Sequence, residues 1–483
     1  MNEIINKFIY LSSLFIGVFF IYKNNQDLND LQLFLIFFMY ISTITIAFLP
    51  LIKPIFIGKL PLIYLVNLYF LICYLGIFVF DKYKILSLEK YNKDDHTAAI
   101  NTLFLGYSFF LIGYFFVKKI FKNYKRKSIS YLETSTNETL LIGIPLLILV
   151  IIFFYLFNIQ NYFKFLSQLK YILLLFSIGL CFDIVLKKSL KNLITYFLLI
   201  LIILPIFFEL LEGSYNFPFM VLILMYAQYS VNREKINIIP FLLVGFIFLI
   251  IHSGKYDYRH ETWYEKNNDL NLLEKSKIFL NYYLNNNEII FIDGHLTKKN
   301  LFNIGSDDNY KQEKRIFHSY WSLLIVTKNT PKLIPYWQGY SYQILKSKLI
   351  PRIFWKNKPS DRLGNEFGHR YNVLTKDTNL TKKDISTSWN MPVLNEFYVN
   401  YGNLGVSIGM FIIGIIIGLL TKISSFGNNS NLEIVISFYL FLPLFFFESH
   451  LSLLFGAIIQ SYIFLLIFSF CYLFLLRKLT SIK

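Results

Sequence analysis

Long apolar runs separated by short polar segments make up most of this chain. About twelve of the runs have the length of roughly 20 residues that an α-helix needs to cross a hydrocarbon core of about 30 Å. They lie at residues 6–22, 32–50, 61–80, 100–117, 139–157, 168–186, 192–208, 216–231, 236–252, 403–421, 432–449 and 453–476. The pattern predicts an all-α polytopic membrane protein with about 12 transmembrane helices.

One polar segment, residues 253–402, interrupts the runs and is too long to be a simple connection between helices. It divides the chain into three predicted parts. Residues 1–252 form an N-terminal transmembrane bundle of about nine spans, residues 253–402 form a large loop, and residues 403–483 form a C-terminal bundle of about three spans.

Within the loop, two stretches have helical character. Ile316–Val326 is apolar and Tyr340–Leu349 is amphipathic, and a proline follows soon after each. Both are expected to form interfacial helices that lie on the membrane. An irregular segment near Ser388–Asn400 is expected to re-enter the top of the bundle.

The composition excludes a soluble protein, because 55% of the residues are hydrophobic and only 16% are charged. A net charge of +17 would suggest a nucleic-acid partner in a soluble chain. Here the cations gather in particular connections, so their positions indicate topology and no nucleic-acid partner is expected.

Every second short connection is basic. Lys and Arg crowd the connections after the fourth, sixth and eighth runs and the C-terminal end, whereas the alternate connections carry Asp27, Asp30, Glu209 and Glu212. Short cytoplasmic loops are enriched in Lys and Arg, so both termini are predicted to be cytoplasmic. Residues 253–402 are then on the outer face of the membrane.

The loop interleaves cationic and aromatic side chains. Guanidinium and ammonium groups neutralise phosphate and aromatic faces stack on rings, so the pattern favours an anionic, partly sugar-like ligand. The alternative is a solvated basic loop whose aromatic residues rest on lipid headgroups. The candidate ligand-binding residues are Arg352, Trp355, Lys358, Arg362, His369 and Arg370, together with Tyr340 and Tyr398.

Two further positions could take part in catalysis. Arg315 and His318 are one helical turn apart and share a face that could point toward the bundle mouth or could snorkel to water. Glu396 stands just before the tenth run, where partial desolvation would suit a general base; its alternative is a salt bridge to a nearby Arg.

Other acidic groups are weaker candidates. Glu209 and Glu212, with Glu448 and His450, lie at predicted outer turns, and Asp94-Asp95-His96 could hold a divalent metal. No phosphate-binding loop, dinucleotide fingerprint or common hydrolase motif is present in the sequence, which disfavours nucleotide-driven pumping and common hydrolase chemistry.

Several short motifs, taken together, resemble a known family. They are Thr330-Pro331, the turn Gly339-Tyr340-Ser341-Tyr342, Ile350-Pro351-Arg352, Trp355, Lys358-Pro359 and the stretch from Glu396 through Asn400 to Gly405. Over roughly residues 315–415 they resemble Wzy-type polymerases of oligosaccharide repeat units, the O-antigen polymerases. One departure is that relatives often carry an Arg after a Gly-Ser turn before the eighth span, whereas Tyr215 follows Gly213-Ser214 here.

The resemblance implies a glycosyltransferase-type enzyme of the bacterial plasma (inner) membrane that makes surface polysaccharide of the lipopolysaccharide O-antigen or capsule type. An acceptor hydroxyl attacks the anomeric carbon of a second chain, and undecaprenyl pyrophosphate leaves. Arg352 and Arg315 would stabilise the leaving group, and Glu396 or His318 would take the proton. No cofactor or metal is implied. The expected partners are the undecaprenyl-pyrophosphate-linked oligosaccharide, membrane lipids and a protein that regulates chain length.

Three alternatives stay open from the sequence. A ligase that moves finished glycan to another lipid shares the donor. A glycosyltransferase that uses polyprenyl-phosphate sugars would need Asp94 and Asp95. A glycan flippase should carry its polar groups at the middle of the membrane, whereas the polar residues here are concentrated in one loop.

Overall fold

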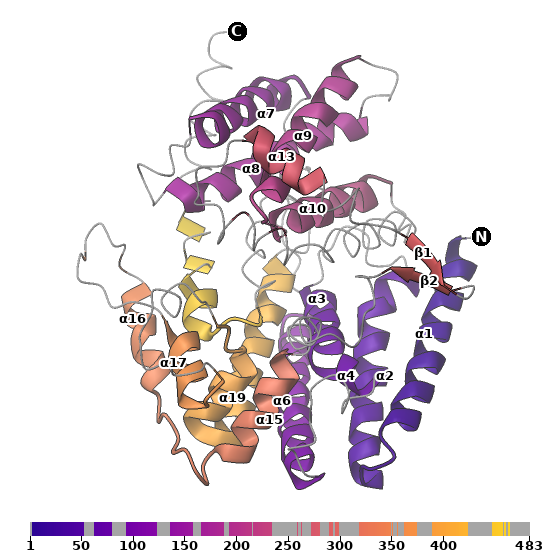
Figure 1. Cartoon of the computed structure of the whole chain (residues 1–483), viewed down its shortest axis with the longest axis vertical. Helices are drawn as coiled ribbons and strands as arrows, with labels where there is room; N and C mark the ends of the chain where they lie inside the picture. Colours follow the sequence, from indigo (N-terminus) through magenta and orange to yellow (C-terminus); the bar gives the residue numbers. More distant parts are fainter. Residues whose placement is uncertain are drawn as a thin grey trace. The chain divides into compact units, whose positions relative to one another are not determined.

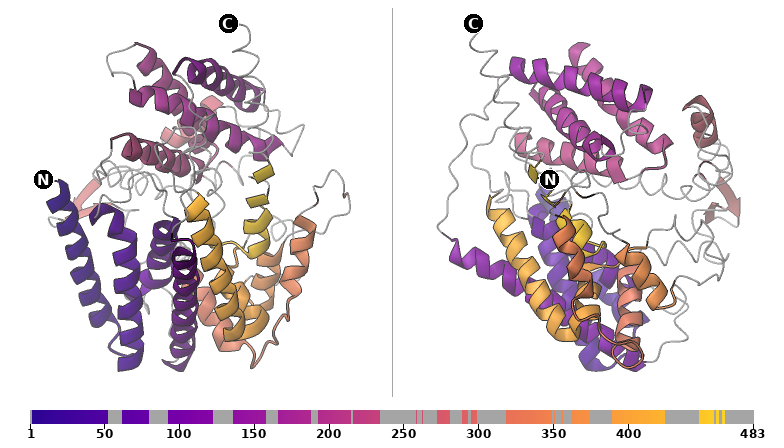
Figure 2. Two further views of the ribbon diagram at one scale, coloured as in Figure 1. Left: turned by 180° about the vertical axis from the view of Figure 1, so that it is seen from behind. Right: turned by 90° about the vertical axis from the view of Figure 1, so that its left-hand side faces the viewer.

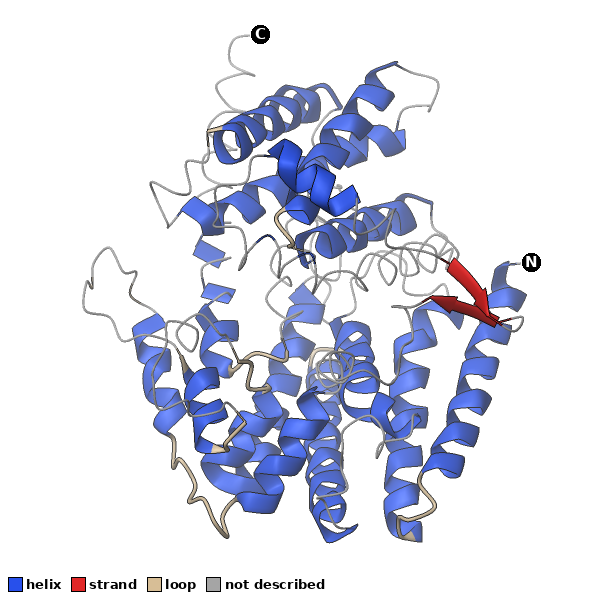
Figure 3. Ribbon diagram, viewed as in Figure 1, coloured by secondary structure: helices blue, strands red, loops and turns tan. Residues whose placement is uncertain are grey.

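The computed structural model describes the chain in segments: residues 2–52, 62–79, 93–122, 136–157, 166–187, 193–214, 216–233, 258, 262, 272–280, 289–292, 295–298, 318–348, 350, 355, 362–373, 389–423, 447–456, 458–459 and 462–463. The described residues are mostly helical (Figure 3). One antiparallel two-stranded ribbon, β1 (Ile289–Ile292) paired with β2 (His295–Lys298), departs from the all-α prediction.

Four helices among the described residues are long and apolar enough to cross a membrane, which makes this a membrane protein. They are α2 (Asp30–Ile52), α6 (Lys93–Ile120), α9 (Leu193–Leu211) and α19 (Val393–Ile423). The predicted run at 236–252 lies outside the described residues, as does most of the run at 432–449.

The chain divides into two compact units that do not follow the order of the sequence. The first contains residues 1–126, 310–425 and 440–475, and the second contains residues 127–309, 426–439 and 476–483. The first unit therefore joins the beginning of the chain to its last third. The predicted division into 1–252, 253–402 and 403–483 stays a prediction.

The first unit is a bundle of long helices (Figure 1). Besides α2, α6 and α19, it contains α1 (Asn2–Asn24) and one continuous helix made of α3 (Leu62–Tyr69), the π-helix η2 (Phe70–Leu75) and α4 (Gly76–Val79). Shorter helices follow later in the chain: α15 (His318–Asn329), the 3₁₀-helix η9 (Tyr340–Ile344), α16 (Leu345–Lys348) and α17 (Leu363–Arg370).

Side-chain contacts fix the relative directions of these helices. Tyr10 bonds Thr45 and Tyr40 bonds Ser13, so α1 and α2 are antiparallel. Thr102 near the start of α6 bonds Asn403, whereas Val117 near its end contacts Gly418, so α6 and α19 are parallel. By the same reasoning α2 is parallel to α6, because Gln32 bonds Thr97 and the Phe38 and Phe104 rings lie 5.9 Å apart.

Small residues bring α6 and α19 close together. A Cβ on Gly113 would lie 2.2 Å from the carbonyl oxygen of Phe411, and a Cβ on Gly414 would lie 2.2 Å from the carbonyl oxygen of Phe110. Small residues that let backbones approach are characteristic of helix packing in membranes, where apolar burial alone does not hold helices together.

The described residues of the polar loop from His318 onward pack into the first unit beside α19, whereas those before residue 310 belong to the second unit (Figure 2). Helix α15 confirms the helix predicted over Ile316–Val326, but Ser322–Thr327 is buried rather than lying on a surface. The second predicted helix is shorter than expected and begins as a 3₁₀ turn at Tyr340. The segment predicted to be irregular over Ser388–Asn400 is helical from Val393.

The second unit is also mostly helical. It contains α7 (Thr136–Ile151), η5 (a π-helix, Ile152–Leu156), α8 (Leu166–Lys187), α9, α10 (Asn216–Arg233), α13 (Leu272–Leu280) and the β1–β2 ribbon. Lys170 and Glu209 form a buried ion pair within it, with Nζ and Oε1 2.5 Å apart.

Candidate functional site

The first two turns of α19 and the two residues before them are enclosed, since every residue from Met391 to Asn400 is buried. The helix breaks directly after this segment, at Tyr401 (φ −143°) and Gly402 (φ +60°). Positive φ suits glycine because it has no Cβ. A break of this kind leaves backbone carbonyls of the preceding turn without a partner inside the helix.

A loop from the polar segment supplies partners for those carbonyls. The N–H of Trp337 donates to the carbonyl of Val399 at 2.9 Å, and the N–H of Gln338 donates to that of Asn400 at 3.2 Å. The Asn400 side chain fastens the same loop, because its Oδ1 accepts from Gly339 N–H at 2.9 Å and its Nδ2 donates to Ser341 Oγ at 2.8 Å. We call residues 336–342 the docked loop.

Glu396 lies one turn before Asn400 and is fully buried. Its Oε2 accepts the N–H of Leu451 at 2.5 Å, where a short helix over residues 451–456 begins. A carboxylate at a helix N-terminus is favoured by the helix dipole. Burial, together with the nearby Glu396 charge, raises the pKa of Tyr342. Glu396 therefore joins α19 to the helix over residues 451–456.

Tyr398, predicted to bind substrate, lies on the inner side of the docked loop. Its hydroxyl donates to the Thr330 carbonyl at 3.3 Å, and its ring lies 6.4 Å from that of Tyr336. The Thr330 hydroxyl is 2.5 Å from that of Tyr371. These contacts tie α15, α17 and α19 together around the loop.

An aromatic and charged surface forms where the docked loop meets α17. The Arg370 guanidinium donates to the Pro335 carbonyl at 2.5 Å and lies 5.6 Å from the centre of the Trp337 ring. The ring centres of Tyr340 and Trp337 lie 5.8 Å apart, and Tyr340 is 44% exposed. The negative charge of Glu366 raises the pKa of the Tyr340 hydroxyl. We call Trp337, Tyr340, Glu366 and Arg370 the loop surface.

Glu366 was not among the site residues predicted from the sequence, although a signal was available. Glu366 and Arg370 are four residues apart and therefore share one face of α17. Glu366 is exposed, unlike Glu396. The loop surface thus presents a carboxylate, a guanidinium and an accessible phenol ring, which are the groups that recognise sugars and phosphates.

His318 lies in a cluster of tryptophans. Its ring centre is 4.8 Å from that of Trp389 and 6.3 Å from that of Trp321. This packing leaves the His318 side chain half-buried, and the loss of surrounding water lowers its pKa to about 4. A general base works best when its pKa is near the working pH, so His318 is a weak candidate for that role.

The other predicted ligand-binding residues are not brought together by contacts of the described residues. Arg362 immediately precedes α17 and is exposed, Trp355 is 37% exposed, and His369 is half-buried on α17. Arg315, Arg352 and Lys358 lie outside the described residues.

Asp95 and His96, near the start of α6, are engaged in packing. Asp95 Oδ2 is 2.8 Å from Lys328 Nζ at the end of α15, and His96 Nδ1 is 2.9 Å from the Tyr320 hydroxyl. Within the described part of the chain, no three His, Cys, Asp or Glu side chains are grouped so that they could hold a metal ion.

Two buried asparagines that the sequence did not single out, Asn395 and Asn400, hydrogen-bond α19 to neighbouring segments. Asn395 donates to Ser322 Oγ at 2.6 Å and to the Ser319 carbonyl at 3.2 Å, and it accepts from the Tyr74 hydroxyl at 3.2 Å. Amides this deep inside a helix bundle are costly unless they are hydrogen-bonded. The spacing of Asn395 and Asn400 within an otherwise apolar segment was the available signal.

Comparisons with protein-family models, with curated proteins and with solved structures found no match to this chain.

Proposed function

We propose that this protein polymerises undecaprenyl-pyrophosphate-linked oligosaccharide repeat units into surface polysaccharide at the outer face of the bacterial plasma membrane. The proposal rests on the resemblance of residues 315–415 to Wzy-type polymerases and on one structural observation. The docked loop is bonded to the break in α19, which presents the aromatic and charged loop surface at one end of the helix bundle.

The chemistry requires a rigid surface of this kind. Pyrophosphate gains negative charge as it leaves the anomeric carbon, and a fixed guanidinium stabilises that charge most in the transition state. Arg370 is held by the Pro335 carbonyl and the Trp337 ring, so little reorganisation is needed when an anion arrives. Tyr340 offers its exposed ring to a sugar.

The acceptor hydroxyl must also lose a proton. Glu396 is the base favoured by the sequence, and it is enclosed; Glu366 is the exposed carboxylate of the loop surface. The two carboxylates give distinct hypotheses. Either Glu396 takes the proton, or Glu396 positions α19 against residues 451–456 and Glu366 takes it.

We also propose that the chain crosses the membrane about 12 times, with both termini in the cytoplasm and residues 253–402 on the outer face. Helices α2, α6 and α19, which are parallel, correspond to the second, fourth and tenth predicted runs, as strict alternation requires. Lys118, Lys119 and Lys422 lie at the same end of the α6–α19 pair, which suits a cytoplasmic face. Reporters fused after Lys125 and after Ser306 should report opposite sides, and identical sides would contradict the scheme.

The test of the function is deletion of the gene in its native host, with the surface glycan separated by size. We expect the long polymer to collapse to a single repeat unit and to return when the gene is restored. A finished polymer that accumulates on its lipid carrier without transfer would indicate a ligase instead. Unchanged surface glycan would contradict both.

A further inference from the structure

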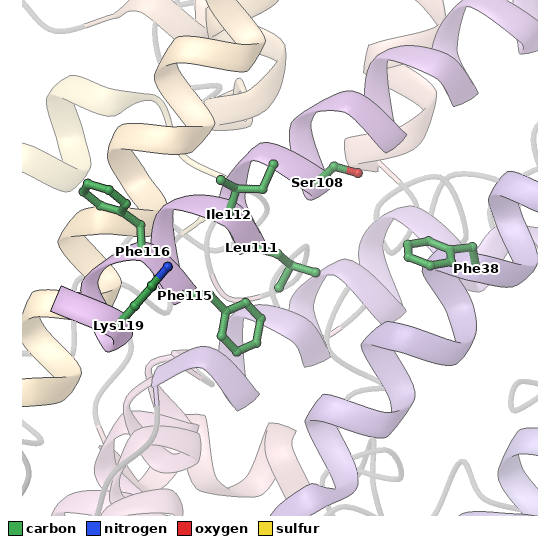
Figure 4. Close-up of a pocket in the computed structure, with 7 residues that line it drawn as sticks. All are labelled: Phe38, Ser108, Leu111, Ile112, Phe115, Phe116 and Lys119. Carbon is green, nitrogen blue, oxygen red and sulfur yellow. The ribbon is translucent and has the colours of Figure 1, made fainter. Parts of the chain in front are cut away.

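A shallow groove runs along the outside of the first unit between α2 and α6. It has a volume of about 540 Å³ and is lined by Phe38, Ser108, Leu111, Ile112, Phe115, Phe116 and Lys119 (Figure 4). That volume is within the roughly 300–1,000 Å³ typical of small-molecule sites. The groove lies away from the loop surface, on helices that are apolar enough to span the membrane.

The walls of the groove are apolar and open to the lipid. Four apolar side chains of the walls are each between 46% and 53% exposed: Phe38, Ile112, Phe115 and Phe116. Phe38 packs on Phe104 with ring centres 5.9 Å apart, and Phe116 packs on Phe411 at 6.1 Å. These ring contacts hold the aromatic walls in place, so the groove is a feature of the packed bundle.

One end of the groove is basic. Lys119 lines it, and Lys118 Nζ lies 5.8 Å from the centre of the Phe115 ring. Lys122 follows one turn later in the chain, and Lys125, Arg126 and Lys127 continue the basic run in the sequence. Figure 4 shows Lys119 at one end and Phe38 at the other.

The length of the groove matches one leaflet. From Ser108 to Lys119, α6 rises by about 16 Å at roughly 1.5 Å per residue. One leaflet contributes about half of a hydrocarbon core of about 30 Å. An acyl chain lying in the groove would therefore place its headgroup at the Lys119 end, where a cation meets the phosphate.

From this juxtaposition we propose that the groove between α2 and α6 is a binding site for one anionic phospholipid, with an acyl chain along Ser108–Phe116 and its phosphate at Lys119. Basic clusters at the ends of spans attract anionic headgroups, and pockets between spans add a place for the tail. The proposal is independent of the polymerase activity, because it depends only on α2 and α6 being in a membrane.

The test uses the full-length protein purified from membranes and exchanged into mixtures of phosphatidylglycerol and phosphatidylethanolamine with the same acyl chains. Lipid that stays bound is extracted and quantified by mass spectrometry. We expect phosphatidylglycerol to be enriched over the mixture, and Lys119→Gln to reduce the enrichment about fivefold. The matched control is Lys422→Gln. Lys422 lies at the end of α19, which is the same end of the α6–α19 pair as Lys119, but it does not line the groove.

Two variants separate the groove from simple electrostatic attraction. Ser108→Trp fills the groove and Phe115→Ala removes one of its walls, and both leave the lysines in place. Each should lose the enrichment while it elutes as a single species with wild-type helical content. No enrichment in the wild type would overturn the proposal. So would equal losses in Lys119→Gln and Lys422→Gln, or enrichment that survives in both groove variants, since these outcomes indicate diffuse attraction only.

Discussion

The two compact units each bury a glutamate, and they satisfy its carboxylate in different ways. In the second unit, Glu209 pairs with Lys170 at 2.5 Å and accepts hydrogen bonds from the hydroxyls of Tyr155 at 2.7 Å and Tyr171 at 3.2 Å. In the first unit, Glu396 accepts the backbone N–H of Leu451. Side chains therefore pair with the Glu209 carboxylate, whereas a backbone N–H 55 residues away in the chain donates to the Glu396 carboxylate.

The difference indicates different roles. The Lys170 ammonium also lies 4.1 Å from the Tyr155 ring centre and 5.5 Å from that of Tyr171, so the Glu209 cluster is balanced in charge and packed. A cluster of this kind holds helices together. Glu396 instead belongs to the segment that anchors the docked loop, and it helps determine where the loop surface lies.

The largest effect is expected in the second unit. Lys170→Met leaves the Glu209 carboxylate buried without its cation, which typically costs about 3–5 kcal/mol. Thermal unfolding of the purified protein in detergent should show a marked loss of stability. The matched control is Lys275→Met, because Lys275 also pairs with a glutamate, Glu212 at 2.8 Å, but near the surface. There we expect about 0–1 kcal/mol. Equal losses in the two variants would contradict the structural role of the Glu209 cluster.

In the first unit, replacement of Glu396 separates chemistry from positioning. Glu396→Gln keeps an oxygen that can accept the Leu451 N–H, so a purely positioning residue should tolerate it. Loss of a general base costs about 10²–10⁴ in rate. We expect Glu396→Gln to stop elongation in a folded protein if Glu396 takes the proton, and Glu366→Gln to do so if Glu366 does.

Glu396→Ala completes the comparison, because it removes both the acceptor and the carboxylate. Activity lost in Glu396→Ala but kept in Glu396→Gln would assign Glu396 to positioning. Full polymer length in all three variants would remove both carboxylates from the mechanism.

A smaller effect should follow from loosening the docked loop. Asn400→Ala removes the acceptor for Gly339 N–H and the donor to Ser341, and leaving buried polar groups unsatisfied costs about 1–3 kcal/mol. Hydrogen exchange at Trp337, Gln338 and Gly339 should accelerate, while exchange in α8 and α9 stays unchanged. Unchanged protection in the loop would show that Asn400 does not hold it.

The smallest effect concerns pH. The pKa of His318 is about 4 in the folded protein and about 6.5 when unfolded, so the unfolded state binds more protons between these values. Stability should therefore fall as the pH drops from about 6.5 to 4, by an amount on the order of 1–2 kcal/mol because the ring is partly exposed. His318→Phe should flatten this dependence in thermal unfolding. An equally steep dependence in the variant would assign the titration to another group.

The helices of the bundle could be predicted from the sequence because apolar runs of spanning length have few alternatives. The predicted runs at 32–50 and 100–117 correspond to α2 and α6. Helix α19 begins at Val393, ten residues before the predicted run at 403. The predicted start was too late because Asn395, Glu396 and Asn400 lower the local hydropathy. Hydropathy alone could not reveal that these polar groups find hydrogen-bond partners inside the bundle.

The candidate site could be predicted only in part. Tyr340, Arg370 and Tyr398 do gather around the docked loop, as their density in one segment suggested. The burial of Glu396 and the tryptophan cluster around His318 depend on contacts between segments far apart in the chain. Sequence spacing carries no information on such contacts between distant segments.

The most direct test of the central proposal is elongation by the purified protein. Lipid-linked repeat unit isolated from the deletion strain is the substrate, so its sugar composition need not be known in advance, and products are separated by size. We expect a ladder of polymers with release of undecaprenyl pyrophosphate. Arg370→Ala should slow the reaction about 10²–10³-fold, because a fixed charge at the leaving group is lost. Folded wild-type protein that leaves the repeat unit unextended would contradict the proposed function.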